Sequence, residues 1–282
     1  MNDTTSPGKW RDLGVRAGAA IALLPVVIFC IWYGGVAYLA MLILAAGLMS
    51  NEWCRLIYPE RNRSLQTALH GLTVLAVILC LTLGLVATAW LFLVIGWGAS
   101  VGFAWRSAPD SFPWAWFGMP YIALPMAALY VLRADSQYGL IAVIWLFAVI
   151  WSTDTGAYFA GRIFGGPKLA PRFSPKKTWA GLVGGALLAA VASGFITYYS
   201  GLPGGGKLAM LAALAAVISQ GGDIFESAAK RRFGVKDSGA ILPGHGGILD
   251  RVDGLIFAAV FCAILGLARG GFANAGAGLL IW

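Results

Sequence analysis

Two carboxylates and a lysine in the C-terminal half of the chain have the spacing of one helical face. Asp223 and Glu226 are three positions apart and Lys230 follows four positions later, so all three project from the same side of a helix. With Gly221 and Gly222 beside them, the carboxylates could hold a hard cation while a bulky ligand approaches the backbone. An ion pair between Glu226 and Lys230 is the simpler alternative, but it leaves Asp223 unexplained.

The densest polar run of the chain begins at Lys230 and ends at Asp253. Asp250 and Asp253 share a face of the first turn of a further predicted helix, and cations and glycines precede them. Carboxylates, cations and glycine-freed backbone amides together are typical of a site that binds phosphates through a divalent metal ion. The enrichment of Lys and Arg in cytoplasmic loops would alone explain the cations up to Lys236, but it would not explain the acids and the histidine. The other candidate residues of this run are Arg231, Asp237, Gly244, His245, Gly246, Gly247 and Arg251.

A second basic segment lies between two apolar runs. Ser174 and Pro175 fit the N-cap and first position of a helix, and Lys176 and Lys177 follow directly. Free backbone amides and two lysines at the positive end of a helix dipole would bind an anion. An ordinary helix cap in a positively charged cytoplasmic loop explains the segment almost equally well.

Asp154 lies near the end of another apolar run. A carboxylate inside a membrane is costly unless it meets a cation or a metal ion, so Asp154 is a candidate for the site. The alternative is an acid at a helix end that reaches water and pairs with Arg162.

The elements that must position these residues are transmembrane helices. Of 282 residues, 59% are hydrophobic and 11% are charged, and the mean hydropathy is +0.78. This composition excludes a single soluble core, and the long continuous apolar runs exclude the alternating strands of a β-barrel. We predict an all-α, polytopic integral membrane protein with about nine transmembrane helices. The expected spans are 15–33, 35–50, 67–86, 88–105, 115–132, 139–160, 179–200, 207–229 and 253–269.

The distribution of positive charge predicts the orientation. With a cytoplasmic N-terminus, all of the 20 Lys and Arg residues lie in inner segments except Arg133, Lys207 and Arg269. The chain is then a multi-pass protein of the cytoplasmic (inner) membrane whose site faces the cytoplasm. Because topology explains the net charge of +8, we expect no nucleic-acid partner.

The chemistry-bearing residues are unevenly distributed between the two halves. We expect residues 1–135 to form a scaffold of transmembrane helices, with a break at 51–64. Residues 136–282 would form the catalytic region, with cytoplasmic loops at 161–178 and 230–252.

These segments resemble the signature of the phosphatidate cytidylyltransferases, the CDP-diacylglycerol synthases. The motifs that carry the resemblance are Ser227-x-x-Lys230-Arg231, Lys236-Asp237 and Pro243-Gly244-His245-Gly246-Gly247-x-x-Asp250-Arg251-x-Asp253. The segments 154–158, 174–179 and 222–227 are also similar to that family. Ala180 departs from it, because many members have an acidic residue there.

The resemblance implies a reaction of phospholipid biosynthesis in which phosphatidic acid and CTP give CDP-diacylglycerol and pyrophosphate. It implies Mg²⁺, either one ion or two, with a monovalent cation such as K⁺ as a further candidate, and it suggests a homodimer. Since both substrates are anions, catalysis should rest on charge neutralisation and in-line positioning.

Residue roles follow from this expectation. We expect Asp223 and Asp250 to ligate metal, with Asp154, Glu226 and Asp253 as weaker candidates. His245 would orient a phosphate or a carboxylate. The residues expected to bind substrate, mainly its phosphates, are Ser174, Lys176, Lys177, Lys230, Arg231, Lys236, Asp237 and Arg251, together with the backbone at Gly244, Gly246 and Gly247.

Two other functions fit the same residues. A transporter or channel for an organic anion also has intramembrane acids and basic vestibules, although its polar residues would be expected near the midplane. Another lipid-linked cytidylyl or phosphoryl transferase could use the same site on a different lipid.

Overall fold

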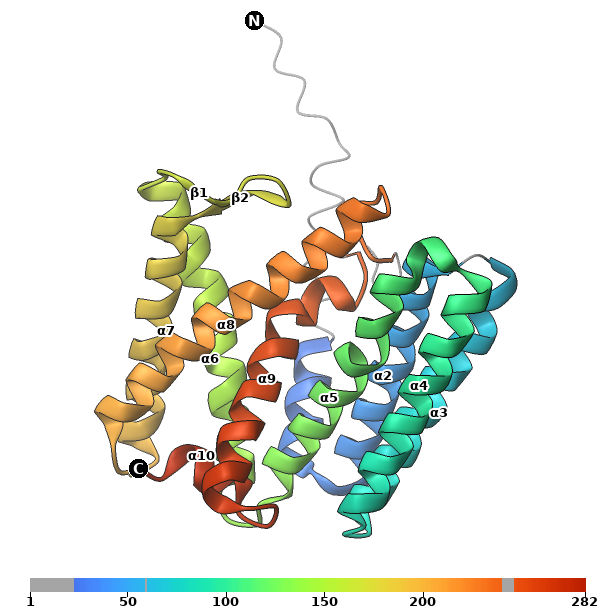
Figure 1. Ribbon diagram of the computed structural model, residues 1–282. Helices are drawn as coiled ribbons and strands as arrows, with labels where there is room; N and C mark the ends of the chain where they lie inside the picture. The colour runs from blue at the N-terminus through green and yellow to red at the C-terminus, as the bar shows by residue number, and fades with distance from the viewer. Residues whose placement is uncertain (1–22, 59, 240–245) are drawn as a thin grey trace, which may run out of the picture.

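The computed structural model describes residues 23–58, 60–239 and 246–282, and long apolar helices dominate it (Figure 1). Eight of the described helical segments are long and apolar enough to cross a membrane, which confirms the predicted all-α polytopic class. They are α2 (Gly35–Ile57), α3 (Glu60–Thr82), α4 (Val86–Ser107), α5 (Phe112–Ala134) with the short 3-10 helix η1 (Pro109–Ser111) before it, α6 (Gly139–Ile163), α7 (Trp179–Tyr199), α8 (Gly205–Arg232) and α9 (Leu249–Gly270).

Most spans lie within a few residues of their predicted bounds, and the main difference is at α2. The expected break at 51–64 is wrong: α2 continues to Ile57 and α3 already begins at Glu60. The apolar helix Leu23–Tyr33 is the described part of the first expected span, and the residues before it lie outside the described range.

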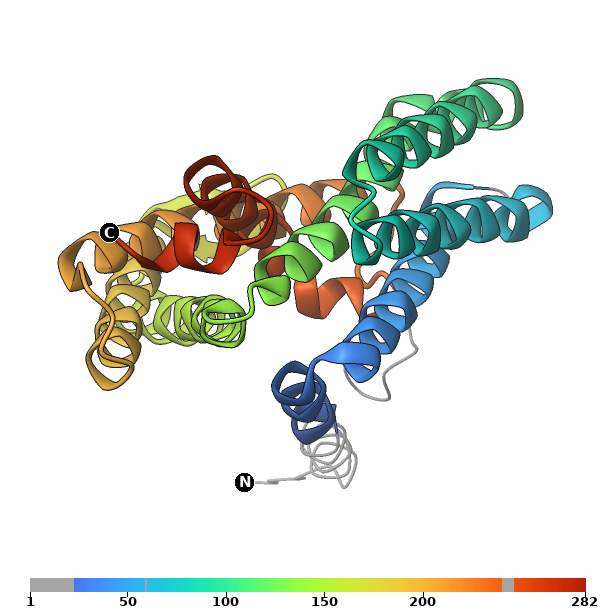
Figure 2. The same cartoon turned by 90° about the horizontal axis from the view of Figure 1, so that it is seen from below.

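Two groups of helices flank a central pair. Figure 2 shows α3 and α4 at one end of the bundle and α6 and α7 at the other, with α5 and α9 between them. Helix α5 packs against α2, α3, α4, α6 and α9, and it is the most buried span. The short helix α10 (Ala275–Leu280) folds back on α9, where Arg269 donates hydrogen bonds to the carbonyls of Gly278 and Ile281.

A two-stranded antiparallel hairpin, β1 (Lys168–Ala170) and β2 (Ser174–Thr178), occupies the segment before α7. The predicted helix cap at Ser174 is therefore wrong. Thr178 is the N-cap, and its hydroxyl accepts a hydrogen bond from the Gly181 amide at 3.0 Å. Residues 174–178 pair with β1 instead, and threonine serves as a cap almost as well as serine.

Candidate active site

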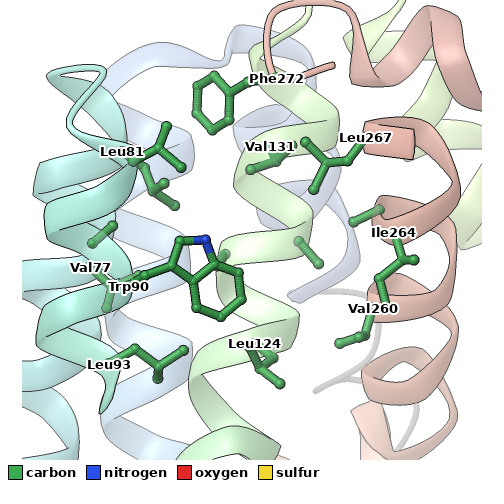
Figure 3. A pocket seen from close by; sticks show the side chains of 15 residues that line it. Val77, Leu81, Trp90, Leu93, Leu124, Val131, Val260, Ile264, Leu267 and Phe272 are labelled. Carbon is green, nitrogen blue, oxygen red and sulfur yellow. The ribbon is translucent and has the colours of Figure 1, made fainter. Parts of the chain in front are cut away.

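The polar residues of interest gather at the end of the bundle that carries β2, the C-terminal end of α8 and the start of α9 (Figure 1). An apolar cavity of about 360 Å³ lies farther along α9, between α3, α4, α5 and α9. Aliphatic and aromatic side chains line it, including Trp90, Leu124 and Ile264 (Figure 3). Its first α9 residue, Val260, is about 10 Å beyond Asp253 at the helical rise of ~1.5 Å per residue. The polar side chains of interest therefore lie outside this apolar cavity.

Lys177 joins the hairpin to the stripe on α8. Its ammonium group forms an ion pair with Asp223 and donates a hydrogen bond to Gln220 Oε1 at 2.9 Å. Lys177 is partly buried, as is Asp223. The structure thus places Lys177 in contact with an α8 carboxylate and with Gln220, which lies one turn before Asp223.

Lys230 joins α8 to α9. Its Nζ lies 2.5 Å from Asp250 Oδ1 and 3.2 Å from Glu226 Oε1, and Lys230 is buried. The simple ion pair within α8 does exist, but the shorter contact is to the other helix. Lys230 therefore holds together the two carboxylate groups that sequence spacing placed on separate helices.

Asp250 organises the backbone before α9. Its Oδ2 accepts hydrogen bonds from the Ser238 amide at 3.0 Å, the Ser238 hydroxyl at 2.9 Å and the Gly247 amide at 2.8 Å. Gly246 has a φ of +80°, and a Cβ there would lie 2.9 Å from the same oxygen. Gly244 and His245 lie outside the described residues, so their expected roles stay predictions.

Helices α8 and α9 approach each other closely beside the acids. A Cβ on Gly222 would lie 2.4 Å from the Asp253 carbonyl oxygen, and one on Gly254 would lie 3.0 Å from Asp223 Oδ1. This approach brings Asp253 within electrostatic range of Asp223 and Glu226. A third carboxylate thereby joins the α8 stripe.

Asp154 also faces this region. It interacts electrostatically with Asp223 and with Lys177. Arg162, the partner that the alternative explanation required, donates instead to the Tyr158 hydroxyl at 2.8 Å.

The remaining predicted residues lie around the rim. Lys176 is exposed, because consecutive residues of a strand point to opposite faces and Lys177 takes the inner one. Ser174 is half-buried and opposes Ala170 in the hairpin, and Arg231 donates to the Val235 carbonyl at 3.1 Å. The other exposed residues of this group are Lys236, Asp237 and Arg251.

Glu52 is a contributor that the sequence analysis missed. It belongs to α2, has 0% exposure, and contacts Ser238 and the start of α9. The signal was present in the apolar pattern, since Met49, Trp53 and Ile57 continue the helical period of α2 past the expected break. The acid was instead assigned to a loop.

The carboxylate oxygens around Asp223 are better placed to bind a hard cation than the oxygens of Asp250. The Glu226 carboxylate is buried, its Oε1 lies 3.2 Å from Lys230 Nζ, and Asp223 and Asp253 lie nearby. Both oxygens of Asp250 are already bonded to Lys230, Ser238 or Gly247. Within the described ranges no three His, Cys, Asp or Glu side chains form a ready metal site. An ion here would therefore complete its shell with water or phosphate oxygens, as Mg²⁺ commonly does.

Comparison with known proteins identifies the family of this chain. A model of the Cytidylyltransferase family matches residues 14–268. The phosphatidate cytidylyltransferase of Brucella suis biovar 1 (strain 1330) is 41% identical over 261 residues, covering 90% of this chain and 93% of that protein. The phosphatidate cytidylyltransferase of Rickettsia felis (strain ATCC VR-1525 / URRWXCal2) is 40% identical over 160 residues, covering 53% of this chain and 69% of that protein.

A third relative matches about half of the chain, as the Rickettsia felis protein does. The phosphatidate cytidylyltransferase of Bacillus subtilis (strain 168) is 43% identical over 152 residues, covering 50% of this chain and 56% of that protein. Since the family model spans most of the sequence, including every residue of the site described above, the chain belongs to the Cytidylyltransferase family.

Proposed function

We propose that this protein is a CTP:phosphatidate cytidylyltransferase that forms CDP-diacylglycerol and pyrophosphate. The observation that carries the proposal is the pair of lysine–carboxylate contacts, Lys177 with Asp223 and Lys230 with Asp250, at one end of a transmembrane bundle. The same reaction is named for the relatives above. A lipid phosphate in the bilayer and a soluble nucleotide can both reach a site at that end.

The reaction depends more on neutralising the charge of the phosphates than on covalent catalysis by the protein. A phosphate oxygen of phosphatidic acid attacks the α-phosphorus of CTP, a new P–O bond forms, and the bond to the β-phosphate oxygen breaks to release pyrophosphate. Both reactants are anions, so the barrier falls when fixed positive groups neutralise their phosphates and hold them in line. Lys177 and Lys230, which contact acids of the site, would supply such positive groups.

The lysines and acids can exchange partners when substrate arrives. In the structure each of these two lysines neutralises a carboxylate, which avoids leaving a charge unpaired in a partly buried site. We infer that substrate phosphates take over part of the Lys177 interaction. Asp223 then becomes available for a cation.

Mg²⁺ is the cation that we propose for the site. Asp223 and Glu226 would hold it, with Asp253 beside them, because their oxygen atoms match its ligand preference. When bound, it would supply additional positive charge next to the phosphates. A second Mg²⁺ or a monovalent ion such as K⁺ would bind to carboxylate oxygens that the first Mg²⁺ does not use. Asp250 would contribute by fixing Lys230, Ser238 and Gly247.

The distribution of Lys and Arg residues indicates which side of the membrane the site faces. We propose that the site faces the cytoplasm from the inner membrane, because its end of the bundle carries most of the lysines and arginines. The homodimer suggested by family resemblance stays a prediction, which the mass of the detergent-solubilised protein would test.

The first experiment is an assay of purified, detergent-solubilised protein with radiolabelled CTP and phosphatidic acid, scored as lipid-soluble cytidine. We expect product with Mg²⁺ and none after chelation. A folded sample that makes no product with phosphatidic acid but does with another lipid phosphate would identify a related transferase. A folded sample inactive with all of them, but able to move an anion across vesicles, would favour the transporter alternative.

The variant Asp223→Asn tests the metal proposal. It keeps the shape of the side chain but removes its charge, so we expect turnover to be abolished while the protein still folds and inserts. Asp110→Asn is the control for the same change of charge at the surface, since Asp110 is exposed on the short helix η1. Full activity of Asp223→Asn would contradict the assignment.

A further inference from the structure

Glu52 is a buried carboxylate that connects the N-terminal half of the bundle to the site. Its Oε1 accepts a hydrogen bond from the Ile248 amide at 2.8 Å. Its Oε2 accepts bonds from the Leu249 amide at 2.9 Å and from the Ser238 hydroxyl at 3.1 Å. Since α9 begins at Leu249, this side chain from α2 satisfies backbone donors at the start of the helix that carries Asp250.

The surroundings of Glu52 are shaped to hold its carboxylate. A Cβ on Gly247 would lie 2.5 Å from Glu52 Oε2, and one on Gly239 would lie 2.8 Å from Glu52 Oε1. Only glycine leaves room for the backbone on both sides. A carboxylate with 0% exposure is costly unless donors surround it, and here three donors do. Such an arrangement specifies one position of Ser238 and of the start of α9 against α2.

Ser238 extends this connection to the acids of the site. Its hydroxyl lies 3.1 Å from Glu52 Oε2 and 2.9 Å from Asp250 Oδ2, and a hydroxyl has one proton to share between these two acceptors. Asp250 in turn binds Lys230 through its other oxygen. A continuous chain of contacts therefore runs from α2 through Ser238 and Asp250 to Lys230 on α8.

We propose that Glu52 is a positioning residue for nucleotidyl transfer, acting through Ser238 and Asp250 on the placement of Lys230. This inference rests on the function proposed above. Lys177 stands outside the chain of contacts, because its described partners are Asp223 and Gln220. Loss of Glu52 should therefore lower kcat much more than it raises the KM for CTP.

Glu52→Gln is the most direct test. The amide nitrogen of glutamine must face the backbone N–H of either Ile248 or Leu249, so a donor opposes a donor in either orientation. We expect kcat to fall about tenfold or more, the loss typical of a broken buried hydrogen bond to a charged group, with the KM for CTP changed less than about threefold. Amide hydrogen exchange in peptides covering 246–252 should become about tenfold faster, since those amides lose their acceptor.

Ser100→Ala is the matched control. Ser100 is also fully buried and bonds to Gln66 and His70, and these three residues lie on α3 and α4, which carry none of the site residues described above. It should lower the melting temperature and leave both kcat and exchange at 246–252 unchanged. If Glu52→Gln retains the wild-type kcat, or if both variants lose kcat only in proportion to lost folded protein, the positioning role is refuted.

Ser238→Ala keeps the proposal testable if Glu52→Gln fails to fold. It should reproduce the kcat loss with a similar KM for CTP, and a wild-type kcat would refute the pathway. Where both single variants fold, their combination should lose little more than the worse one, because they interrupt one chain of contacts. If the kcat loss of the double variant equals the product of the two single losses, Glu52 and Ser238 act independently. An inactive wild type would refute the proposed function instead, and the exchange measurement alone would then decide whether Glu52 positions residues 246–252.

Discussion

At the scale of single residues, adjacent lysines of one strand have different environments. Lys177 is turned inward to Asp223 and Gln220, whereas Lys176 is exposed. The two were equivalent candidates in the sequence because both were assigned to a helix start. In a strand, side chains alternate between faces, so one of the two lysines is selected by backbone geometry.

The variants Lys177→Ala and Lys176→Ala should therefore differ. We expect Lys177→Ala to raise the KM for CTP about tenfold or more, because a charge-assisted contact to phosphate typically contributes ~1.5–3 kcal/mol. Lys176→Ala should change it less than about threefold, as expected for an exposed charge. Steady-state kinetics at saturating phosphatidic acid measures both. Equal effects of the two variants would show that the positive charge of the segment, rather than the strand geometry, binds the nucleotide.

At the scale of elements, the crossing of α8 and α9 determines which acids meet. Gly222 allows the α9 backbone to approach, and Asp253 thereby reaches the neighbourhood of Asp223 and Glu226. Gly221, the preceding residue, has Phe257 at 4.0 Å from a hypothetical Cβ, which is an ordinary contact distance. The two neighbouring glycines thus have different roles in packing.

Gly222→Ala and Gly221→Ala form a matched pair at this crossing. The added methyl group of Gly222→Ala meets the backbone carbonyl of Asp253, so the helices must separate at a cost of about 1–3 kcal/mol. We expect a lower melting temperature and a lower kcat. Gly221→Ala should be neutral or slightly stabilising, because alanine favours a helix by up to ~1 kcal/mol over glycine. A Gly222→Ala protein with wild-type stability and kcat would show that the close approach is dispensable.

At the scale of the whole molecule, the polar site and the apolar cavity occupy different depths of one bundle. The hairpin and the start of α9 lie at one end, and the turn between α7 and α8 lies at the other (Figure 1). Most positively charged residues belong to the first end, which predicts that it faces the cytoplasm. A site at a membrane surface lets a soluble nucleotide and a membrane lipid meet without either crossing the bilayer.

Thiol labelling tests this orientation. Lys168→Cys lies in the hairpin and Ser200→Cys lies in the turn after α7, and both positions are exposed. With a membrane-impermeant maleimide, Ser200→Cys should react in intact cells, and Lys168→Cys should react only after permeabilisation. The unsubstituted protein, with Cys54, Cys80 and Cys262 buried, measures the background. The reverse pattern would place the site on the outer face.

The class of fold could be predicted from the sequence because it depends on composition and local periodicity. A mean hydropathy of +0.78 and runs of about twenty apolar residues require membrane-spanning helices. The spacing of Asp223, Glu226 and Lys230 placed them on one face, because a helix repeats every ~3.6 residues whatever packs against it. These inferences needed no knowledge of distant contacts.

Sequence patterns predicted the wrong local structure where two local structures were almost equally compatible with the residues. Ser174 and Thr178 are both good helix caps, and pairing with β1 decided in favour of Thr178. The polar residues around Glu52 were interpreted as a loop, although α2 continues to Ile57. A buried acid in a helix is stable only if donors meet it, and those donors come from residues almost two hundred positions later.

The sequence by itself determined the membrane class, the approximate spans and the acids and lysines from which a site could be built. Tertiary structure decided their partners: Lys177 with Asp223, Lys230 with Asp250 as well as Glu226, and Glu52 with the start of α9. The physical reason is that helical periodicity is local, whereas the burial of a charge depends on which distant donors and cations the packed helices bring within hydrogen-bond distance.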